Sequence, residues 1–339
     1  AFSKDEHLKG DFEFPVVAFY DLDISWQAYL FYTINIKPKK INASLAFDLY
    51  PVLRVQDWLE RSPEGALIYK ETRAQELVEV LWSYDKSPWK DRINMLGETN
   101  TSSTITQAAL IRSLVATFIK TSTTKSLGGL YGALLLDETP LVWDRTQQAA
   151  FLIYSWQIMV SKIEASKEEW AVKLRTQVKR EVQQKLFNEL PGVDPAFISR
   201  YALISTDQGV RGFFNIINDF VYSRSKELKI NMITWQEERI NEDRIDGNDV
   251  GKAITQFKKA SALTNYLDAI CDELVKFNWR TSSEPSLNET ERRAQMVFKG
   301  SSGYKELRIQ LLQLLAKSKD KDIKVASITI QSELGYGNS

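Results

Sequence analysis

The segment Arg145–Leu190, RTQQAAFLIYSWQIMVSKIEASKEEWAVKLRTQVKREVQQKLFNEL, carries the clearest helical signal in the chain. From Ile163 onward its apolar residues recur mainly four positions apart, which places them along one face of a helix. This apolar stripe consists of Ile163, Trp170, Leu174, Val178, Val182, Leu186 and Leu190. Pro191 and Gly192 follow directly and are typical of a helix end. The segment therefore predicts a long amphipathic helix.

The rest of the chain after residue 60 has helical periodicity almost throughout. We predict further helices at about residues 104–120, 195–204, 208–230, 251–278, 288–298 and 303–317. Linkers rich in Gly, Ser, Asn, Asp or Pro separate them, at residues 83–104, 121–132, 243–251 and 281–288. The pattern predicts a large helical domain over residues 61–325 and a tail over residues 326–339.

Residues 1–60 differ because they contain a clear strand pattern. The run Phe14–Tyr20 (FPVVAFY) is apolar and rich in aromatic and β-branched residues, which is typical of a buried strand. Asp21 or Asp23 can cap a helix that follows, and another helix is expected from about Ser44. We predict an α+β fold that is predominantly α-helical, with a partial α/β lobe at its N-terminus.

The charge of the chain is balanced, because 44 Lys and Arg residues offset 44 Asp and Glu residues among 339. Binding of nucleic acid would therefore depend on a local basic patch and not on the field of the whole molecule. Hydrophobic residues make up 43% of the chain, which is typical of a globular protein. No apolar run approaches the roughly 18 residues needed to cross a bilayer, so we expect no membrane insertion and a cytoplasmic protein.

Two scarce residue types limit the chemistry of the chain. Cys271 is the single cysteine, so an internal disulfide and a zinc site built from cysteines are both excluded. Its apolar helical surroundings predict a buried, unreactive thiol. His7 is the single histidine, which excludes metal sites that need two histidines. No complete catalytic motif is found, so catalytic residues cannot be assigned and no metal ligands are predicted.

A basic segment follows the first predicted helix. It reads Asn35-Ile-Lys37-Pro38-Lys39-Lys40 and places three lysines within four positions. Such a group beside a helix end could hold a phosphate of a nucleotide or of nucleic acid, with Asn35 orienting it. The alternative is the ordinary enrichment of basic residues at a helix C-terminus.

A second basic face is predicted on the helix at about residues 163–190. Lys173, Arg175, Lys179 and Arg180 lie largely off its apolar stripe and could follow a nucleic-acid backbone. Four glutamates on the same helix dilute this charge, so a simple solvated face is the alternative.

Several sequence blocks invite comparison with known protein families. The first blocks are FPVVAFYDLD at residues 14–23 and LFYTINIKPKKI at residues 30–41. Further blocks are SPW at 87–89 followed by Arg92-Ile93, ITQ at 105–107, STDQGV at 205–210 and GSSGYKELR at 300–308. Together they resemble the DGQHR-domain family, which includes relatives of DndB and resembles the wider ParB/sulfiredoxin-like fold. The resemblance covers most of the chain. It implies that residues 1–60 are the C-terminal part of a ParB-like domain whose DGQHR signature precedes residue 1.

The resemblance also implies roles for two residues after the first helix. ParB proteins carry a Glu-Asn-x-x-Arg motif there, and Asn35 is similar to its Asn while Lys39 lies near the basic position. Ile34 stands where the family has Glu, and this departure argues against CTP hydrolysis of the ParB kind. The segment is then expected to contact phosphate without transferring protons.

Three functions remain open from the sequence. The first is a DNA-associated protein of the DGQHR type, in phage defence or in regulation linked to DNA modification, which acts by binding DNA or nucleotide phosphate and has partners in such a system. The second is a ParB-like nucleotide hydrolase or nuclease whose catalytic motif lies upstream and which uses a nucleotide with Mg²⁺. The third is a helical protein-interaction module. Whether the protein is an enzyme is left open.

Overall fold

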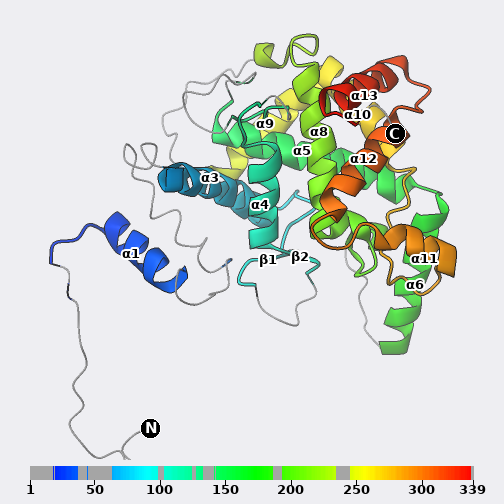
Figure 1. Cartoon of the computed structure of the whole chain (residues 1–339), viewed down its shortest axis with the longest axis horizontal. Coiled ribbons are helices and arrows are strands. Elements are labelled where there is room, and N and C mark those ends of the chain that lie inside the picture. The colour runs from blue at the N-terminus through cyan, green and yellow to red at the C-terminus, as the bar shows by residue number, and fades with distance from the viewer. Residues whose placement is uncertain are drawn as a thin grey trace, which may run out of the picture.

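The computed structural model describes residues 18, 20–36, 44, 63–97, 103–123, 127–132, 141, 143–185, 193–233 and 245–336 (Figure 1). This part of the chain is predominantly helical. Its helices are α1 (Ile24–Ile36), α3 (Pro63–Ser83), α4 (Gln107–Thr117), α5 (Arg145–Ala165), α6 (Glu169–Lys185), α7 (Pro195–Ile198), α8 (Asp207–Ser223), α9 (Gly247–Lys259), α10 (Ser261–Leu274), α11 (Glu289–Met296), α12 (Gly303–Leu315) and α13 (Lys321–Glu333). Two short 3₁₀ helices lie at Leu203–Ser205 and Ile230–Met232.

Two strands, β1 (Ile93–Asn94) and β2 (Ile105–Thr106), form a small parallel sheet. Ile93 pairs with Ile105, and both side chains are buried. Thr106 then caps α4, because its hydroxyl accepts a hydrogen bond from the backbone N–H of Ala109. The sheet therefore fixes where α4 begins.

Two buried helices, α5 and α8, form the centre of the molecule. The first packs against α3, α7, α9 and α10, and the second against α4, α12 and α13. Trp156 of α5 meets Phe213 of α8 with ring centroids 4.2 Å apart. Trp89 and Phe197 also contact the Trp156 ring, at centroid distances of 5.2 and 5.6 Å. This aromatic cluster joins the segments around the two helices into one core.

Helices α4, α8 and α12 lie side by side, with α8 in the middle (Figure 1). Ser113 near the middle of α4 contacts Asp207 at the start of α8, and Phe118 after α4 packs on Phe214 further along α8. Later residues of α4 therefore contact later residues of α8, so these two helices are parallel. The same holds for α12, whose first residues reach the start of α8, so the three helices run in one direction.

Most of the helices predicted after residue 60 are confirmed, but two of the long ones are divided, and the one predicted at residues 195–204 holds only the short α7 and the start of a 3₁₀ helix. The helix predicted from residue 145 to residue 190 is wrong as one element, since residues 166–168 separate α5 from α6. Ser166 takes an extended conformation there, with φ −68° and ψ 135°. The guanidinium of Arg175 bonds to the carbonyl oxygens of Ile163, Glu164 and Ser166 and so satisfies the end of α5.

The helix predicted at residues 251–278 is also two helices, because Ala260 leaves the helical conformation between α9 and α10. The tail predicted from residue 326 begins inside α13, which continues to Glu333. Ile323, Ala326 and Ile330 on that helix are buried, and α13 packs against α8 and α12. The apolar spacing of these three residues places them on one face, which explains why the segment is folded.

The N-terminal predictions have mixed outcomes. The helix after Asp23 is confirmed as α1, and the Asp23 carboxylate accepts hydrogen bonds from the N–H groups of Ser25 and Trp26 at 2.8 and 3.1 Å. The strand predicted at Phe14–Tyr20 and the helix predicted from Ser44 fall almost entirely outside the described residues. The ParB-like lobe therefore stays a prediction.

Candidate functional site

Polar side chains collect where α8 packs between α4 and α12, and several of them are buried. We call this set the polar seam and define it by its members. They are Arg112, Ser113, Lys120, Asp207, Arg211, Asn218, Asp219, Tyr304 and Arg308. Of the α8 members, Asp207 and Arg211 are four residues apart and share one face of the helix, whereas Asp219 lies about three turns beyond Asp207.

The N-terminal half of the seam centres on Asp207. Its carboxylate accepts a hydrogen bond from the Tyr304 hydroxyl and one from Ser113 Oγ at 3.4 Å. Burial, reinforced by the Asp207 carboxylate, raises the pKa of Tyr304 to about 12, so its hydroxyl is protonated at neutral pH and donates. Arg211 lies over the Tyr304 ring, with its guanidinium carbon 3.9 Å from the ring centroid, and its Nε donates to Ser113 Oγ at 3.3 Å. Arg112 lies close enough to lower the pKa of Tyr304 slightly.

The C-terminal half of the seam centres on Asp219, whose side chain is fully buried. Arg308 Nε and Nη2 donate to Asp219 Oδ2 at 2.9 and 2.5 Å, and Asn218 Nδ2 donates to Oδ1 at 3.4 Å. Lys120 lies beside this pair. Burial lowers the pKa of the Lys120 ammonium, Asp219 opposes that change and Arg308 adds to it.

The glycine-rich segment around residues 127–132 is structural and supports this half of the seam. Asn218 Oδ1 accepts the backbone N–H of Leu130 at 2.9 Å, and its Nδ2 donates to the Gly128 carbonyl at 3.0 Å. A Cβ on Gly129 would lie 2.1 Å from the Phe118 carbonyl oxygen, so only glycine fits there. The sequence reading of these glycines as a loop is confirmed.

The seam carries more positive than negative charge. Arg112, Lys120, Arg211 and Arg308 are cationic, whereas Asp207 and Asp219 already accept internal hydrogen bonds. Within the described part of the chain, Arg112, Lys120 and Arg211 have no carboxylate within ion-pair distance. These three cations can therefore bind an anion without giving up a pairing in the fold.

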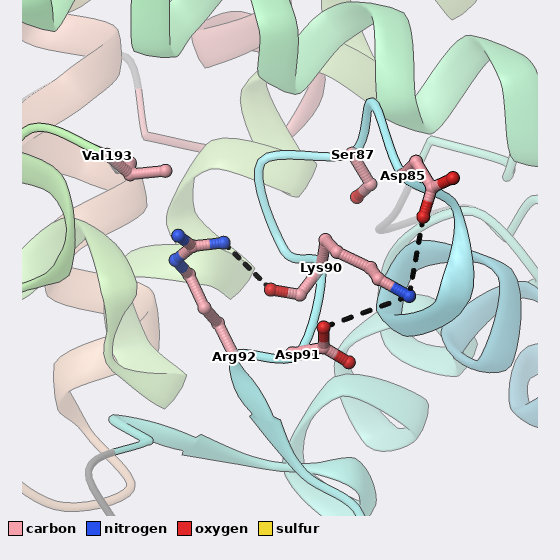
Figure 2. Close-up of a pocket in the computed structure, with 6 residues that line it drawn as sticks. All are labelled: Asp85, Ser87, Lys90, Asp91, Arg92 and Val193. Carbon is pink, nitrogen blue, oxygen red and sulfur yellow. Dashed lines mark hydrogen bonds and ion pairs between the residues drawn. The ribbon is translucent and has the colours of Figure 1, made fainter. Parts of the chain in front are cut away.

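A hollow of about 470 Å³ lies elsewhere, at the loop between α3 and β1 (Figure 2). Its lining residues are Asp85, Ser87, Lys90, Asp91, Arg92 and Val193. Lys90 Nζ lies 3.6 Å from the Asp85 carboxylate and 3.8 Å from that of Asp91, and it donates to the Ser83 carbonyl at 2.9 Å. The two cations and two carboxylates balance, so this hollow differs in charge from the seam.

The structure places only part of the residues that the sequence singled out. Lys37, Lys39 and Lys40 lie outside the described residues, and Asn35 lies in the last turn of α1 without a described side chain. Lys173 and Lys179 are exposed on α6, where Arg180 also lies. Arg175 instead stabilises the fold. Its Nε donates to Asp194 Oδ2 at 2.7 Å, and its other guanidinium nitrogens donate to carbonyl oxygens at the end of α5. Among the described residues, none of the interactions joins Lys173, Arg175 or Lys179 to the seam.

The sequence reasoning missed the seam, although one signal for it was present. Asp207, Arg211, Asn215 and Asp219 place a polar group at every fourth position of a segment that also carries Val210, Phe213, Phe214, Ile216 and Ile217. Two sequence blocks quoted for the family resemblance also meet at the seam. The block at 205–210 contributes Asp207, and the block at 300–308 contributes Tyr304 and Arg308.

Comparisons of the chain with protein-family models, with curated proteins and with solved structures gave no match. In the described part of the chain, none of the helices combines the length and the apolar character of a membrane span. The same residues contain no cluster of three or more His, Cys, Asp or Glu side chains arranged to hold a metal ion. Cys271 is buried there, and burial raises the pKa of its thiol, as its sequence context predicted.

Proposed function

We propose that this protein binds nucleic acid through its phosphates and that the polar seam makes the backbone contact. The observation that carries the proposal is that three cations of the seam, Arg112, Lys120 and Arg211, have no carboxylate within ion-pair distance among the described residues. In a chain of zero net charge, such a local excess is what phosphate binding requires. The DNA-associated role that the resemblance to DGQHR-domain proteins implies is part of the same proposal.

The seam offers the donor types that phosphate binding uses. Arginine presents a planar fork of N–H donors that matches two phosphate oxygens, and Lys120 adds a point charge. Arg211 is held in place by its stacking on Tyr304 and by the bond from its Nε to Ser113, and in the described part of the chain its two terminal nitrogens have no acceptor. This fixed orientation lowers the entropy lost on binding.

The proposal predicts a binding defect in the double variant Arg112→Gln and Arg211→Gln. We expect affinity for a DNA oligonucleotide to fall at least about tenfold, because charge-assisted hydrogen bonds contribute about 1.5–3 kcal/mol. The slope of log affinity against log salt should become shallower by roughly two units, since two phosphate contacts are lost. Fluorescence anisotropy titrations at several salt concentrations measure both quantities.

The matched control is Lys258→Gln with Lys259→Gln at the end of α9, which removes the same charge from exposed positions. An equal loss in this control would mean that general surface charge attracts DNA and that the seam has no special role. The triple variant of Lys37, Lys39 and Lys40 to Ala tests the N-terminal segment in the same assay. If that segment is a second contact, adding the triple substitution to the seam variant should make the slope of log affinity against log salt shallower still.

Lys120 gives the binding a pH dependence with a defined sign. Burial lowers the pKa of its ammonium in the free protein, and a bound phosphate stabilises the charged form and raises that pKa again. Binding should therefore take up a proton at alkaline pH, and affinity should fall as pH rises through the pKa of free Lys120. Calorimetry in two buffers of different ionisation enthalpy detects the proton. Lys120→Arg should remove both effects, and their persistence in this variant would contradict the assignment.

A further inference from the structure

The hollow at the loop between α3 and β1 contains an arginine in an unusual situation. Arg92 is partly buried, and burial lowers the pKa of its guanidinium, an effect that neighbouring Asp91 opposes. Its Nη1 donates to the Lys90 carbonyl at 2.7 Å, and no carboxylate lies within ion-pair distance among the described residues. By contrast, the partly buried Arg145 and Arg224 each pair with a carboxylate. A desolvated cation without a counterion gains most from a bound anion.

The groups around Arg92 indicate which anion fits. Ser87 Oγ accepts the backbone N–H of Trp89 at 3.1 Å, and among the described residues no acceptor takes its own hydrogen, which can therefore be donated. Asp85 and Asp91 line the hollow on the side of Lys90, and their carboxylates are largely exposed (Figure 2). Carboxylates in such positions accept hydrogen bonds from the hydroxyls of a sugar. The hollow thus offers donors for an oxyanion and acceptors for hydroxyl groups.

The loop that carries these residues is held firmly in place. Asp91 donates its N–H to the Trp82 carbonyl and Arg92 donates its N–H to the Trp89 carbonyl, both at 3.0 Å. The Trp89 ring is buried, and it packs on Phe197 at a centroid distance of 5.1 Å. A site on so fixed a loop needs little reorganisation to bind.

We propose that this hollow is a binding site, distinct from the polar seam, for a small phosphate monoester that carries hydroxyl groups. The phosphate binds the Arg92 fork and the Ser87 hydroxyl, and the hydroxyl groups bind Asp85 and Asp91. The volume of about 470 Å³ suits a ligand the size of a sugar phosphate or a mononucleotide. Because the donors and the acceptors belong to different loop residues, the phosphate and the sugar each make their own contribution to the binding free energy.

Isothermal titration of the full chain with ribose 5-phosphate, ribose and inorganic phosphate tests the site. We expect ribose 5-phosphate to bind at least tenfold more tightly than ribose, and Arg92→Gln to remove this preference. Arg224→Gln is the matched control, because it removes a partly buried arginine from another face and should leave binding unchanged. Equal binding of ribose and ribose 5-phosphate, no binding of either, or wild-type binding by Arg92→Gln would each overturn the proposal.

A second variant separates this role from a loss of folding. Asp91 has a positive φ of 56°, a conformation that asparagine also tolerates, so Asp91→Asn removes a negative charge and keeps the backbone. Binding of inorganic phosphate should become severalfold tighter in this variant, a gain that misfolding cannot produce. The seam variant Arg112→Gln with Arg211→Gln should bind ribose 5-phosphate like wild type, whatever its affinity for DNA. A loss there would show that the sugar phosphate binds at the seam and not at Arg92.

Discussion

Asp219→Ala is expected to lower the free energy of unfolding by about 3–5 kcal/mol, the usual cost of removing one partner of a buried ion pair. The Asp219 side chain is fully buried, whereas that of Arg308 is 12% exposed, so the variant leaves a cation with little access to water. Asn218 also loses its contact with the carboxylate, although its bonds to the Gly128 and Leu130 backbone remain. Urea denaturation followed by circular dichroism measures the loss.

A double variant shows whether the uncompensated charge causes that loss. Asp219→Leu combined with Arg308→Met replaces the pair by apolar groups, and it should be more stable than Asp219→Ala alone. If the double variant is the less stable of the two, packing around Asp219 matters more than its charge, and the reasoning about the pair is wrong.

Trp156→Ala is expected to cost about 3–5 kcal/mol, since it removes the largest side chain from the centre of the aromatic cluster. The ring is fully buried and meets four aromatic neighbours, which are Trp89, Phe197, Phe213 and Phe214. Because these neighbours come from three different segments, the loop before β1, α7 and α8, the structure cannot close around the cavity by moving one of them. The midpoint of urea denaturation should fall accordingly.

Trp156→Phe should lose less than half as much as Trp156→Ala. The indole N–H has no hydrogen-bond partner among the described residues, so removing this buried donor recovers part of the stability lost with the smaller ring. Val325→Ala on the exposed side of α13 is the control and should change stability by less than about 0.5 kcal/mol. Similar losses in the Phe and Ala variants would show that an unseen partner satisfies the indole.

The sequence predicted most helices of the described part because their apolar residues recur with the period of a buried helical face. It could not predict the break at residue 166, since that break depends on Arg175, nine residues further on, which folds back to end α5. The strands β1 and β2 have two residues each, too few for any periodicity to be recognised. α13 was missed although Asp320 and the spacing of its apolar residues mark its start and its buried face.

The candidate site was harder to predict than the fold. The polar seam brings together Ser113, Asp207 and Tyr304, which lie 94 and 97 residues apart in sequence. Local charge patterns cannot show such a meeting, so the sequence favoured contiguous basic segments. Arg175, which lies in one of those segments, forms an ion pair within the fold. The seam exists because three helices pack side by side in one direction, which the sequence does not show.

That shared direction has an electrostatic consequence. In most helical bundles neighbouring helices alternate, so their peptide dipoles largely cancel, but those of α4, α8 and α12 add. Each helix N-terminus is equivalent to roughly half a positive charge, so the starts of α8 and α12, which meet at Asp207, together contribute roughly one positive charge before side chains are counted. Asp207 lies in the first turn of α8 and offsets much of this charge. The potential that an approaching anion meets is therefore set jointly by the backbone and by one carboxylate.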